Sequence, residues 1–425
     1  MTSIELAYGR SAHALIYDEA RFSVLDVESA GIGEHHALSD AGINAALDEP
    51  IAAPRLEEIL EPDDTVLVVV SDATRATASA SVVNLLVRRF IACGIAAHDI
   101  NIIFATGIHR PVTTNEKREL LTSFIAQRIK TIDHDALDSS KLVHLGQTKR
   151  GTIIELNDAV TTHTRVILTG GINFHYFAGF TGGRKSICPG LASARTIAAT
   201  HMLALDFERG GRRAGVGSGR LDGNAVHEEC EEIAKHVAPS FLVNTIVDEE
   251  GRAVRVFAGD WQAAHRAACS EYMRRHTIEI AEKRELVIAS CGGAPYDINL
   301  IQAHKTLEMA AQACTEGGTI IWLAECADGL GRADFLKWFT ATDSRSLEDR
   351  LRNQYEVNGQ TAWALLTKAE RFRIYLVSNL PNEVVQHMRM RPARSLNEAL
   401  AGQAAQEKGY IMPRGATLLP VAAAL

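Results

Sequence analysis

The stretch TVLVVVSDATRATAS, residues 65–79, shows the repeating unit from which the fold can be predicted. A run of β-branched residues, typical of a buried strand, ends in a loop of small and polar residues, and a helical pattern follows over about residues 80–90. The same order recurs after NIIFAT (residues 101–106) and after TRVILTGG (residues 164–171), with a helix expected from about Ser193. Strands that alternate with crossover helices predict parallel sheets with helices on both faces.

A second set of such units begins after about residue 275. Its strands are ELVIAS, GTIIWLAEC and FRIYLVSN, which start at residues 285, 318 and 372. The chain therefore reads as two α/β domains, an N-terminal cofactor-binding domain over residues 1–275 and a C-terminal domain over residues 276–425 that contributes substrate-binding residues. The last segment could instead pack back on the first domain. We expect the active site in the cleft between the domains, beyond the carboxyl ends of the strands.

The composition bounds the class of protein. Hydrophobic residues make up 46% and charged residues 23% of 425 residues, values typical of a globular chain. A net charge of −8 with scattered basic residues argues against a nucleic-acid partner. The seven cysteines include no C-x-x-C pair, and neither a signal-peptide pattern nor a membrane-length apolar run is present. These features favour a cytoplasmic protein without a disulfide framework.

Polar residues that directly follow the strands are the first candidates for a site. Arg75, in the SDATR loop, could clamp a carboxylate bidentately, and Asp72 could orient it or bind a ribose hydroxyl. The alternative is a helix-capping aspartate beside a surface arginine. His109, three residues past the next strand, could act as an acid or a base, although a lone loop histidine is commonly a surface residue.

The segment HYFAGFTGGRKSICPG, residues 175–190, resembles a nucleotide phosphate loop without matching it. A phosphate loop needs glycine before its lysine, and this chain has Arg184 before Lys185. Gly182 and Gly183 still allow close backbone approach, and amides in such a turn favour an anion such as a phosphate. The sequence therefore predicts a lysine beside an anion-binding turn.

Further candidates flank this segment. His175 is a second acid/base candidate just past a strand, and the 26-residue spacing from His175 to His201 fits no standard zinc site. In DINLIQAHKTLE, Gln302 and Lys305 are spaced i, i+3 near a helix start, so both should project from one face toward a substrate carboxylate or carbonyl. A solvated helix without a role is the alternative, and His304 is interpreted as structural.

Taken together and in this order, these residues resemble the nickel-pincer-nucleotide lactate racemase family. The resemblance runs from SDATR to about Trp363 and is most specific from His175 to His201. It implies an isomerase that racemises or epimerises a 2-hydroxy acid such as lactate. It also implies a cofactor, pyridinium-3,5-bisthiocarboxylic acid mononucleotide nickel, attached covalently to Lys185, with His201 as the metal ligand and with cofactor-biosynthesis enzymes as partners.

The resemblance also assigns roles residue by residue. It implies acid/base catalysis by His109 and His175, substrate binding by Arg75, Gln302 and Lys305, and cofactor binding by Lys185, Asp72, Gly182, Gly183, His201 and Trp363. One departure concerns the loop after the first strand, where the family commonly continues D-x-T-R with proline and this chain has Ala76. This departure affects the conformation of the Arg75 side chain and, with it, the choice of substrate.

The implied reaction explains the two histidines. Hydride leaves C2 of the substrate for the cofactor while one imidazole takes the hydroxyl proton, and a flat 2-keto acid then receives hydride on its opposite face. A proton carrier is needed on each face. Three alternatives stay open: a nickel or cofactor storage or delivery protein, a P-loop-like phosphotransferase built on GGRKS, and a zinc hydrolase using His109, His175 and His201.

Overall fold

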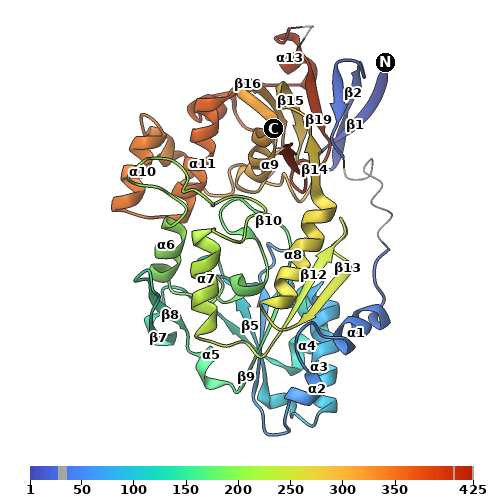
Figure 1. Ribbon diagram of the computed structural model, residues 1–425, viewed down its shortest axis with the longest axis vertical. Helices are drawn as coiled ribbons and strands as arrows, with labels where there is room; N and C mark the ends of the chain where they lie inside the picture. Colours follow the sequence, from blue (N-terminus) through green and yellow to red (C-terminus); the bar gives the residue numbers. More distant parts are fainter. Residues whose placement is uncertain (27–35, 405–406, 424–425) are drawn as a thin grey trace. The chain divides into compact units, whose positions relative to one another are not determined.

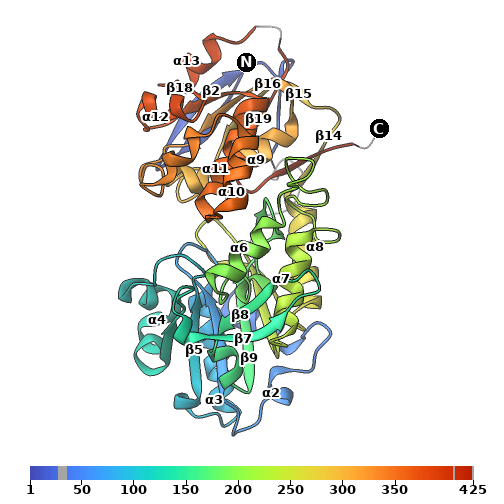
Figure 2. The ribbon, with the colours of Figure 1, turned by 90° about the vertical axis from the view of Figure 1, so that its left-hand side faces the viewer.

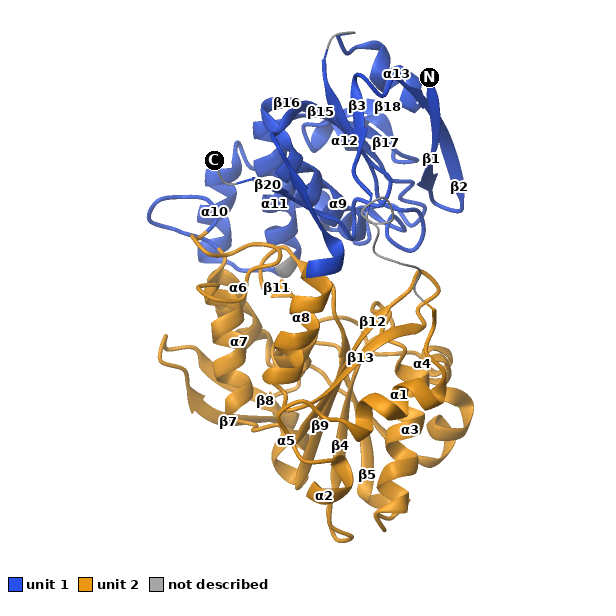
Figure 3. Ribbon diagram, turned by 45° about the vertical axis from the view of Figure 1, so that its right-hand side comes forward, with its two compact units in different colours: residues 1–33, 205–212, 274–425 blue, residues 34–204, 213–273 orange. Residues whose placement is uncertain are grey.

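The structure, a computed structural model, describes residues 1–26, 36–404 and 407–423 and divides into two compact units (Figure 3). Unit 1 comprises residues 1–33, 205–212 and 274–425, and unit 2 comprises residues 34–204 and 213–273. The chain passes from unit 2 to unit 1 between residues 273 and 274, beside the predicted boundary at 275. Residues 1–26 and 205–212 differ from that prediction, because they pack with the C-terminal part of the chain. The last strands also pair within unit 1 rather than with the first domain.

Unit 2 is built on a six-stranded sheet in the order β13-β12-β9-β4-β5-β6, parallel except for the β12–β13 hairpin (Figure 1). Its strands are β4 (Val66–Ser71), β5 (Ile100–Ala105), β6 (Lys130–Asp133), β9 (Arg165–Gly171), β12 (Phe241–Val247) and β13 (Ala253–Gly259). Short hairpins lie outside this sheet: β7 (Leu142–Gln147) with β8 (Ile153–Asn157), and β10 (Phe174–His175) with β11 (Gly179–Phe180).

Helices cover both faces of this sheet, as predicted. Every residue from Val66 to Val70 is fully buried, which explains the unbroken β-branched run. Val66, Val68 and Val70 share a core with α1 (Asp40–Asp48), α2 (Leu56–Ile59), α3 (Ser79–Ala92) and α4 (Thr114–Arg128). These four helices lie together beside the sheet in Figure 1. The 3-10 turn η3 (Gly183–Ser186) contacts β4 and β9, and the remaining helices are α5 (Ala159–Thr162), α6 (Ala194–Met202), α7 (Ala225–Lys235) and α8 (Ala263–His276).

Unit 1 holds a second six-stranded sheet, in the order β18-β17-β16-β15-β19-β3, in which every pair is parallel. Its strands are β3 (Phe22–Val24), β15 (Arg284–Ser290), β16 (Cys314–Leu323), β17 (Arg373–Val377), β18 (Arg391–Ala393) and β19 (Gly409–Met412). The edge strand β3 therefore comes from the start of the chain and pairs with β19 near its end. A separate parallel pair joins β14 (Thr277–Ile280) to β20 (Leu419–Ala422).

The two faces of this sheet are covered differently. Leu286, Ile288 and Ile321 share a core with the hairpin of β1 (Thr2–Tyr8) and β2 (Ser11–Tyr17) and with α13 (Leu396–Ala401). The other helices of unit 1 are α9 (Leu300–Ala313), α10 (Ser344–Asn353), α11 (Val357–Arg371) and α12 (Asn382–His387), and α9 lies beside α11 (Figure 2). Among the described residues, no helix combines the length and the apolar character needed to cross a bilayer.

Candidate functional site

Three neighbouring strands of unit 2 bring the predicted catalytic residues to one edge of the sheet. β9, β4 and β5 lie side by side and run parallel. Asp72 and Arg75 follow β4, His109 follows β5, and His175 follows β9. Because carboxyl ends of parallel strands share an edge, these loops meet there. The amide of Gly107, in the His109 loop, also donates to the carbonyl of Gly190, 2.9 Å away, which ties this loop to the segment carrying Lys185.

Asp72 and His109 form a close pair. The Asp72 Oδ2 lies 2.6 Å from His109 Nδ1, and its Oδ1 accepts from the Thr74 amide at 2.9 Å. Burial by itself raises the pKa of Asp72, but the hydrogen bond and charge of His109 and the Thr74 hydrogen bond outweigh it, so this pKa lies below its ordinary value. A carboxylate only accepts, so Nδ1 of His109 carries a proton and Nε2 is left to exchange one.

His175 presents the opposite arrangement. Its Nδ1 lies 3.2 Å from the amide of Phe177 and 3.1 Å from that of Ala178, and both amides donate to it. A neutral imidazole that accepts at Nδ1 carries its proton on Nε2. That Nε2 lies 3.4 Å from Lys185 Nζ. The two imidazoles are therefore held in different tautomers, and each directs its Nε2 away from the group that orients it.

Lys185 sits in η3 with part of its surface accessible. The turn is anchored by Ser186, whose Oγ donates to the carbonyl of Thr169 in β9 at 3.0 Å. Burial, together with the positive charges of Arg184 and Arg75, lowers the pKa of Lys185 to about 8. A larger fraction of Lys185 is therefore in the neutral amine form than for an ordinary lysine, and the neutral amine is the nucleophile for acylation. A phosphate loop would start its helix at this lysine, whereas the next α-helix here is α6.

The glycines of this turn are required by protein packing. Gly182 and Gly183 have φ of +74° and +54°. A Cβ on Gly182 would come within 2.7 Å of Ile172 Cδ1, and one on Gly183 within 2.6 Å of the His265 ring. The sequence interpretation placed a bound group against these glycines, but protein atoms fill the space on their Cα side. Contact between their backbone and a cofactor stays a prediction.

His201 lies on α6, which begins at the predicted point with Ser193 as its cap, the Ser193 Oγ accepting from the Thr196 amide at 3.1 Å. Burial, together with the nearby charge of Lys185, lowers the pKa of His201 to about 3. This imidazole stays neutral and keeps the lone pair that a metal ion binds. Within the described ranges, no three or more His, Cys, Asp or Glu side chains form a group that could hold a metal ion.

Gln302 and Lys305 lie in unit 1, near the start of α9. Asn299 caps this helix by accepting from the Gln302 amide at 3.0 Å. Lys305 Nζ donates to Gln302 Oε1 at 2.7 Å, so the two side chains project together from one face, as their spacing predicts. His304 is 5% exposed, and its Nδ1 lies 2.5 Å from the carbonyl of Ile301, which agrees with its interpretation as structural.

Trp363 is buried inside unit 1. Its ring is 1% exposed, and its Nε1 donates to Glu348 Oε1 at 2.9 Å. The same Glu348 oxygen accepts from the amide of Gly211 at 2.8 Å. Trp363 therefore helps to hold the 205–212 segment that follows α6. A contact between Trp363 and a cofactor stays a prediction, and this packing gives it no support.

Two groups of buried charged residues, one in each unit, could not be found from sequence. Arg184 was interpreted only as an obstacle to a phosphate loop, yet its side chain is 1% exposed and binds His265, 81 residues away. Glu308 is buried between Arg212 and Lys368, three residues past Lys305. Neither pairing leaves a local sequence pattern, because the partners come from separate elements.

Comparison with known proteins places these observations in a family. Models of the lactate racemase N-terminal and C-terminal domains match residues 8–211 and 280–416. The lactate racemase of Thermoanaerobacterium thermosaccharolyticum is 30% identical over 411 residues, 94% of each chain. That of Lactiplantibacillus plantarum is 29% identical over 425 residues, covering 98% of this chain and 99% of the relative.

Solved structures agree with this assignment. The lactate racemase apoprotein from Thermoanaerobacterium thermosaccharolyticum matches with a TM-score of 0.90 at 28% identity, over 99% of this chain and all of the other. A crystal structure of a Thermotoga maritima protein matches with a TM-score of 0.68 at 17% identity, over 91% and 99% of the two chains, and shows a shared fold. The predicted architecture, with parallel-strand sheets and helices on both faces, is thereby confirmed.

Proposed function

Since the chain belongs to the lactate racemase family of isomerases, we propose that it interconverts the configurations of a 2-hydroxy acid at C2 with a nickel-containing cofactor attached to Lys185. The observation that carries this proposal is the position of Lys185 in unit 2, where its Nζ lies 3.4 Å from His175 and its charge acts on His201, while the loop of His109 is tied to the same segment through Gly107 and Gly190. The family implies a nickel-dependent cofactor. Lactate itself is the substrate named for the relatives, and lactate or a related 2-hydroxy acid is proposed here.

The cofactor proposed is the pincer nucleotide, and the chain's own groups fit it. A lysine amine with a lowered pKa suits an acyl linkage to one arm of the nucleotide, and the neutral imidazole of His201 suits a single protein ligand to a metal held mainly by the cofactor. When bound, this group supplies a reversible acceptor for the C2 hydride. Enzymes that make the cofactor are the partners that this proposal requires.

His109 and His175 are proposed to move the hydroxyl proton. Asp72 holds Nδ1 of His109, so Nε2 can accept a proton while the nearby carboxylate stabilises the imidazolium that forms. His175 presents Nε2–H on the side of Lys185, where it can donate to an oxygen. Oxidation of the alcohol from one face of C2 needs an imidazole that accepts the hydroxyl proton. Reduction of the 2-keto acid from the other face needs an imidazole that donates a proton, and the two histidines form such a pair.

The substrate carboxylate is proposed to be bound by cationic side chains. Arg75 directly follows the Asp72–Thr74 turn after β4, and its own amide donates to the Asp72 carbonyl at 3.2 Å, so its guanidinium starts from a fixed backbone. Lys305 is held by Gln302, and this pair offers a positive charge with an amide for a carboxylate and an adjacent oxygen. No proline follows Arg75, and Ala76 occupies that position.

The test uses protein produced together with the cofactor-making enzymes and a screen of hydroxy acids for racemisation. We expect a nucleotide-sized mass on the peptide that contains Lys185 and slower turnover when C2 carries deuterium. His109→Ala and His175→Ala should each lose racemisation while nickel stays bound. An unmodified Lys185 with full activity would refute the cofactor assignment. Bound nickel without turnover of any hydroxy acid would instead indicate a storage or delivery protein.

A further inference from the structure

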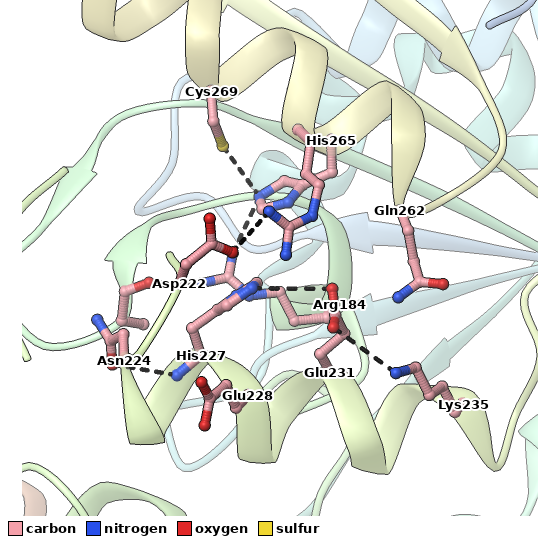
Figure 4. A network of polar contacts seen from close by, with 12 residues as sticks. Arg184, Asp222, Asn224, His227, Glu228, Glu231, Lys235, Gln262, His265 and Cys269 are labelled. Carbon is pink, nitrogen blue, oxygen red and sulfur yellow. Dashed lines mark hydrogen bonds and ion pairs between the residues drawn. The ribbon is translucent and has the colours of Figure 1, made fainter. Parts of the chain in front are cut away.

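The side chain of Arg184 turns into unit 2 and joins three parts of the chain. Its Nη2 donates to the carbonyl of Ala178 at 2.6 Å. Its Nη1 donates to the carbonyl of Gly182 at 3.3 Å and lies 3.0 Å from Nε2 of His265 on α8 (Figure 4). One guanidinium therefore connects the β10–β11 hairpin, the turn that carries Lys185, and a helix far along the chain.

His265 braces the same turn from the side of α8. Its ring packs against Gly183, where a Cβ would approach within 2.6 Å. Nε2 of His265 lies 3.0 Å from Nη1 of Arg184 and 3.1 Å from the carbonyl of Thr181. A guanidinium only donates hydrogen bonds, so the contact with Arg184 uses this nitrogen as an acceptor. Burial, together with the charge of Arg184, lowers the pKa of His265 well below its ordinary value, which agrees with a neutral ring. The Cys269 Sγ lies 3.4 Å from the same Nε2 and helps to enclose it (Figure 4).

The charge of Arg184 is not offset by a carboxylate. In the described part of the chain Arg184 forms no ion pair within 4.0 Å, and its Nε has no hydrogen-bond partner. Glu231 is the acidic group whose charge acts on it, but that carboxylate lies 3.7 Å from both His227 and Lys235 (Figure 4). A buried cation without a carboxylate beside it costs stability even when neutral groups accept its hydrogen bonds, so packing alone gives no reason for an arginine at this position.

Resting on the function proposed for Lys185, we infer that Arg184 is a positioning residue: acting through Ala178 and His265, it fixes the η3 turn so that the Lys185 amine is presented for attachment of the cofactor. The cofactor proposed above is a nucleotide, and its phosphate would bring negative charge to unit 2 on attachment to Lys185. Arg184 and His265 touch neither the substrate nor the reacting atoms in this role.

A purely structural role predicts a different outcome, and the hydrogen bonds allow the two to be separated. The carbonyl of Ala178 also accepts from the Phe180 amide at 2.9 Å, and that of Gly182 accepts from the Lys185 amide at 3.1 Å. Arg184→Met therefore leaves neither carbonyl without a donor, keeps an apolar chain of similar length, and removes a buried charge. The cofactor-free variant should unfold at a temperature no lower than the unaltered protein.

The experiment compares four variants made together with the cofactor-making enzymes. The fraction of Lys185 carrying the nucleotide is measured by peptide mass, and the unfolding temperature is measured on cofactor-free protein. We expect Arg184→Met and His265→Leu to lower that fraction about ten-fold, in proportion to a lost charge-assisted hydrogen bond. His265→Gln keeps an acceptor and should restore it. Arg266→Met, which removes the neighbouring arginine that pairs with Asp222 at 2.9 Å, is the matched control.

Three results would overturn the positioning role: full attachment in Arg184→Met, failure of His265→Gln to exceed His265→Leu, or a loss of attachment matched by a lower unfolding temperature. A second measurement separates this inference from the proposed function. Acylation of Lys185 by an acetyl N-hydroxysuccinimide ester in the cofactor-free protein should be slower in Arg184→Met than in Arg266→Met. If the unaltered protein carries no nucleotide but Lys185 is still acylated more slowly in Arg184→Met than in Arg266→Met, the proposed function is refuted and the positioning role of Arg184 is supported.

Discussion

Replacing Asp72 with asparagine tests the arrangement proposed for the proton acceptor. The side chain keeps its size, and the backbone turn that Thr74 closes can persist. What changes is the charge 2.6 Å from Nδ1 of His109. The carboxylate fixes which nitrogen carries the proton and stabilises the imidazolium formed when Nε2 accepts a second one. The substitution therefore acts on the protonation step and leaves the attachment of a cofactor to Lys185 unchanged.

The size of the effect follows from this geometry. A hydrogen bond to a charged group contributes about 1.5–3 kcal/mol, and one between neutral groups contributes about 1 kcal/mol. Asparagine still accepts from Nδ1, and Asp72 is only 5% exposed, so solvent does little to screen the charge that is lost. The net loss is about 0.5–2 kcal/mol, which corresponds to a decrease in kcat on the order of 2- to 30-fold.

The assay measures kcat in both directions by chiral chromatography and divides it by the fraction of Lys185 that carries the cofactor. Asp64→Asn provides a matched control, because Asp64 is another buried aspartate at the opposite end of β4. It accepts from Thr164 Oγ1 at 2.6 Å and from Arg165 Nε at 2.7 Å, so its loss should lower stability and leave kcat unchanged. The reasoning is refuted if both variants lower kcat equally, or if Asp72→Asn has the kcat of the unaltered protein.

Three further outcomes are expected. His201→Ala should lose nickel while Lys185 keeps the nucleotide, as read by metal analysis and peptide mass; retained nickel would contradict the ligand assignment. Glu308→Gln removes the carboxylate that pairs with Arg212 and Lys368 and should lower the free energy of unfolding in urea by about 3 kcal/mol, whereas an unchanged midpoint would argue against the ion triad. Burial alone would raise the pKa of Glu308, but those two cations hold it well below its ordinary value. The ionised Glu308 therefore stabilises the folded protein at pH values above the ordinary carboxyl pKa, and this stabilisation is lost as pH falls through the folded pKa. The difference in free energy of unfolding between the unaltered protein and Glu308→Gln should become smaller as the pH is lowered.

The strands and the helices that follow them could be predicted because their signals are local. The run from Val66 to Val70 is continuous and fully buried, and α6 begins at Ser193, where its capping residue stands. The placement of residues 1–26 could not be predicted from such signals. β3 is three residues long and gains its sheet partner from β19, so nothing near it in the sequence indicates which unit it joins.

The candidate site divides in the same way. The order of polar residues after the strands was enough to identify the family, and it made His109 and Lys185 candidates for the site. Their chemical state depends on contacts that the sequence does not display, such as the carboxylate beside His109 Nδ1 and the burial of Lys185 next to Arg184. The interpretation of Gly182 as a floor for a ligand illustrates the same limit, because Ile172 and Asn244 fill the space where its side chain would stand.

The pairing of β3 with β19 sets an order of events during translation. The residues of unit 2 emerge from the ribosome as one nearly continuous stretch and can complete their sheet while the remainder is still being made. The segment that contributes β3 has no such opportunity, since the strand that it must bind, β19, is synthesised after the whole of unit 2. The unit that carries Gln302 and Lys305 can therefore complete its sheet only after β19 has left the ribosome.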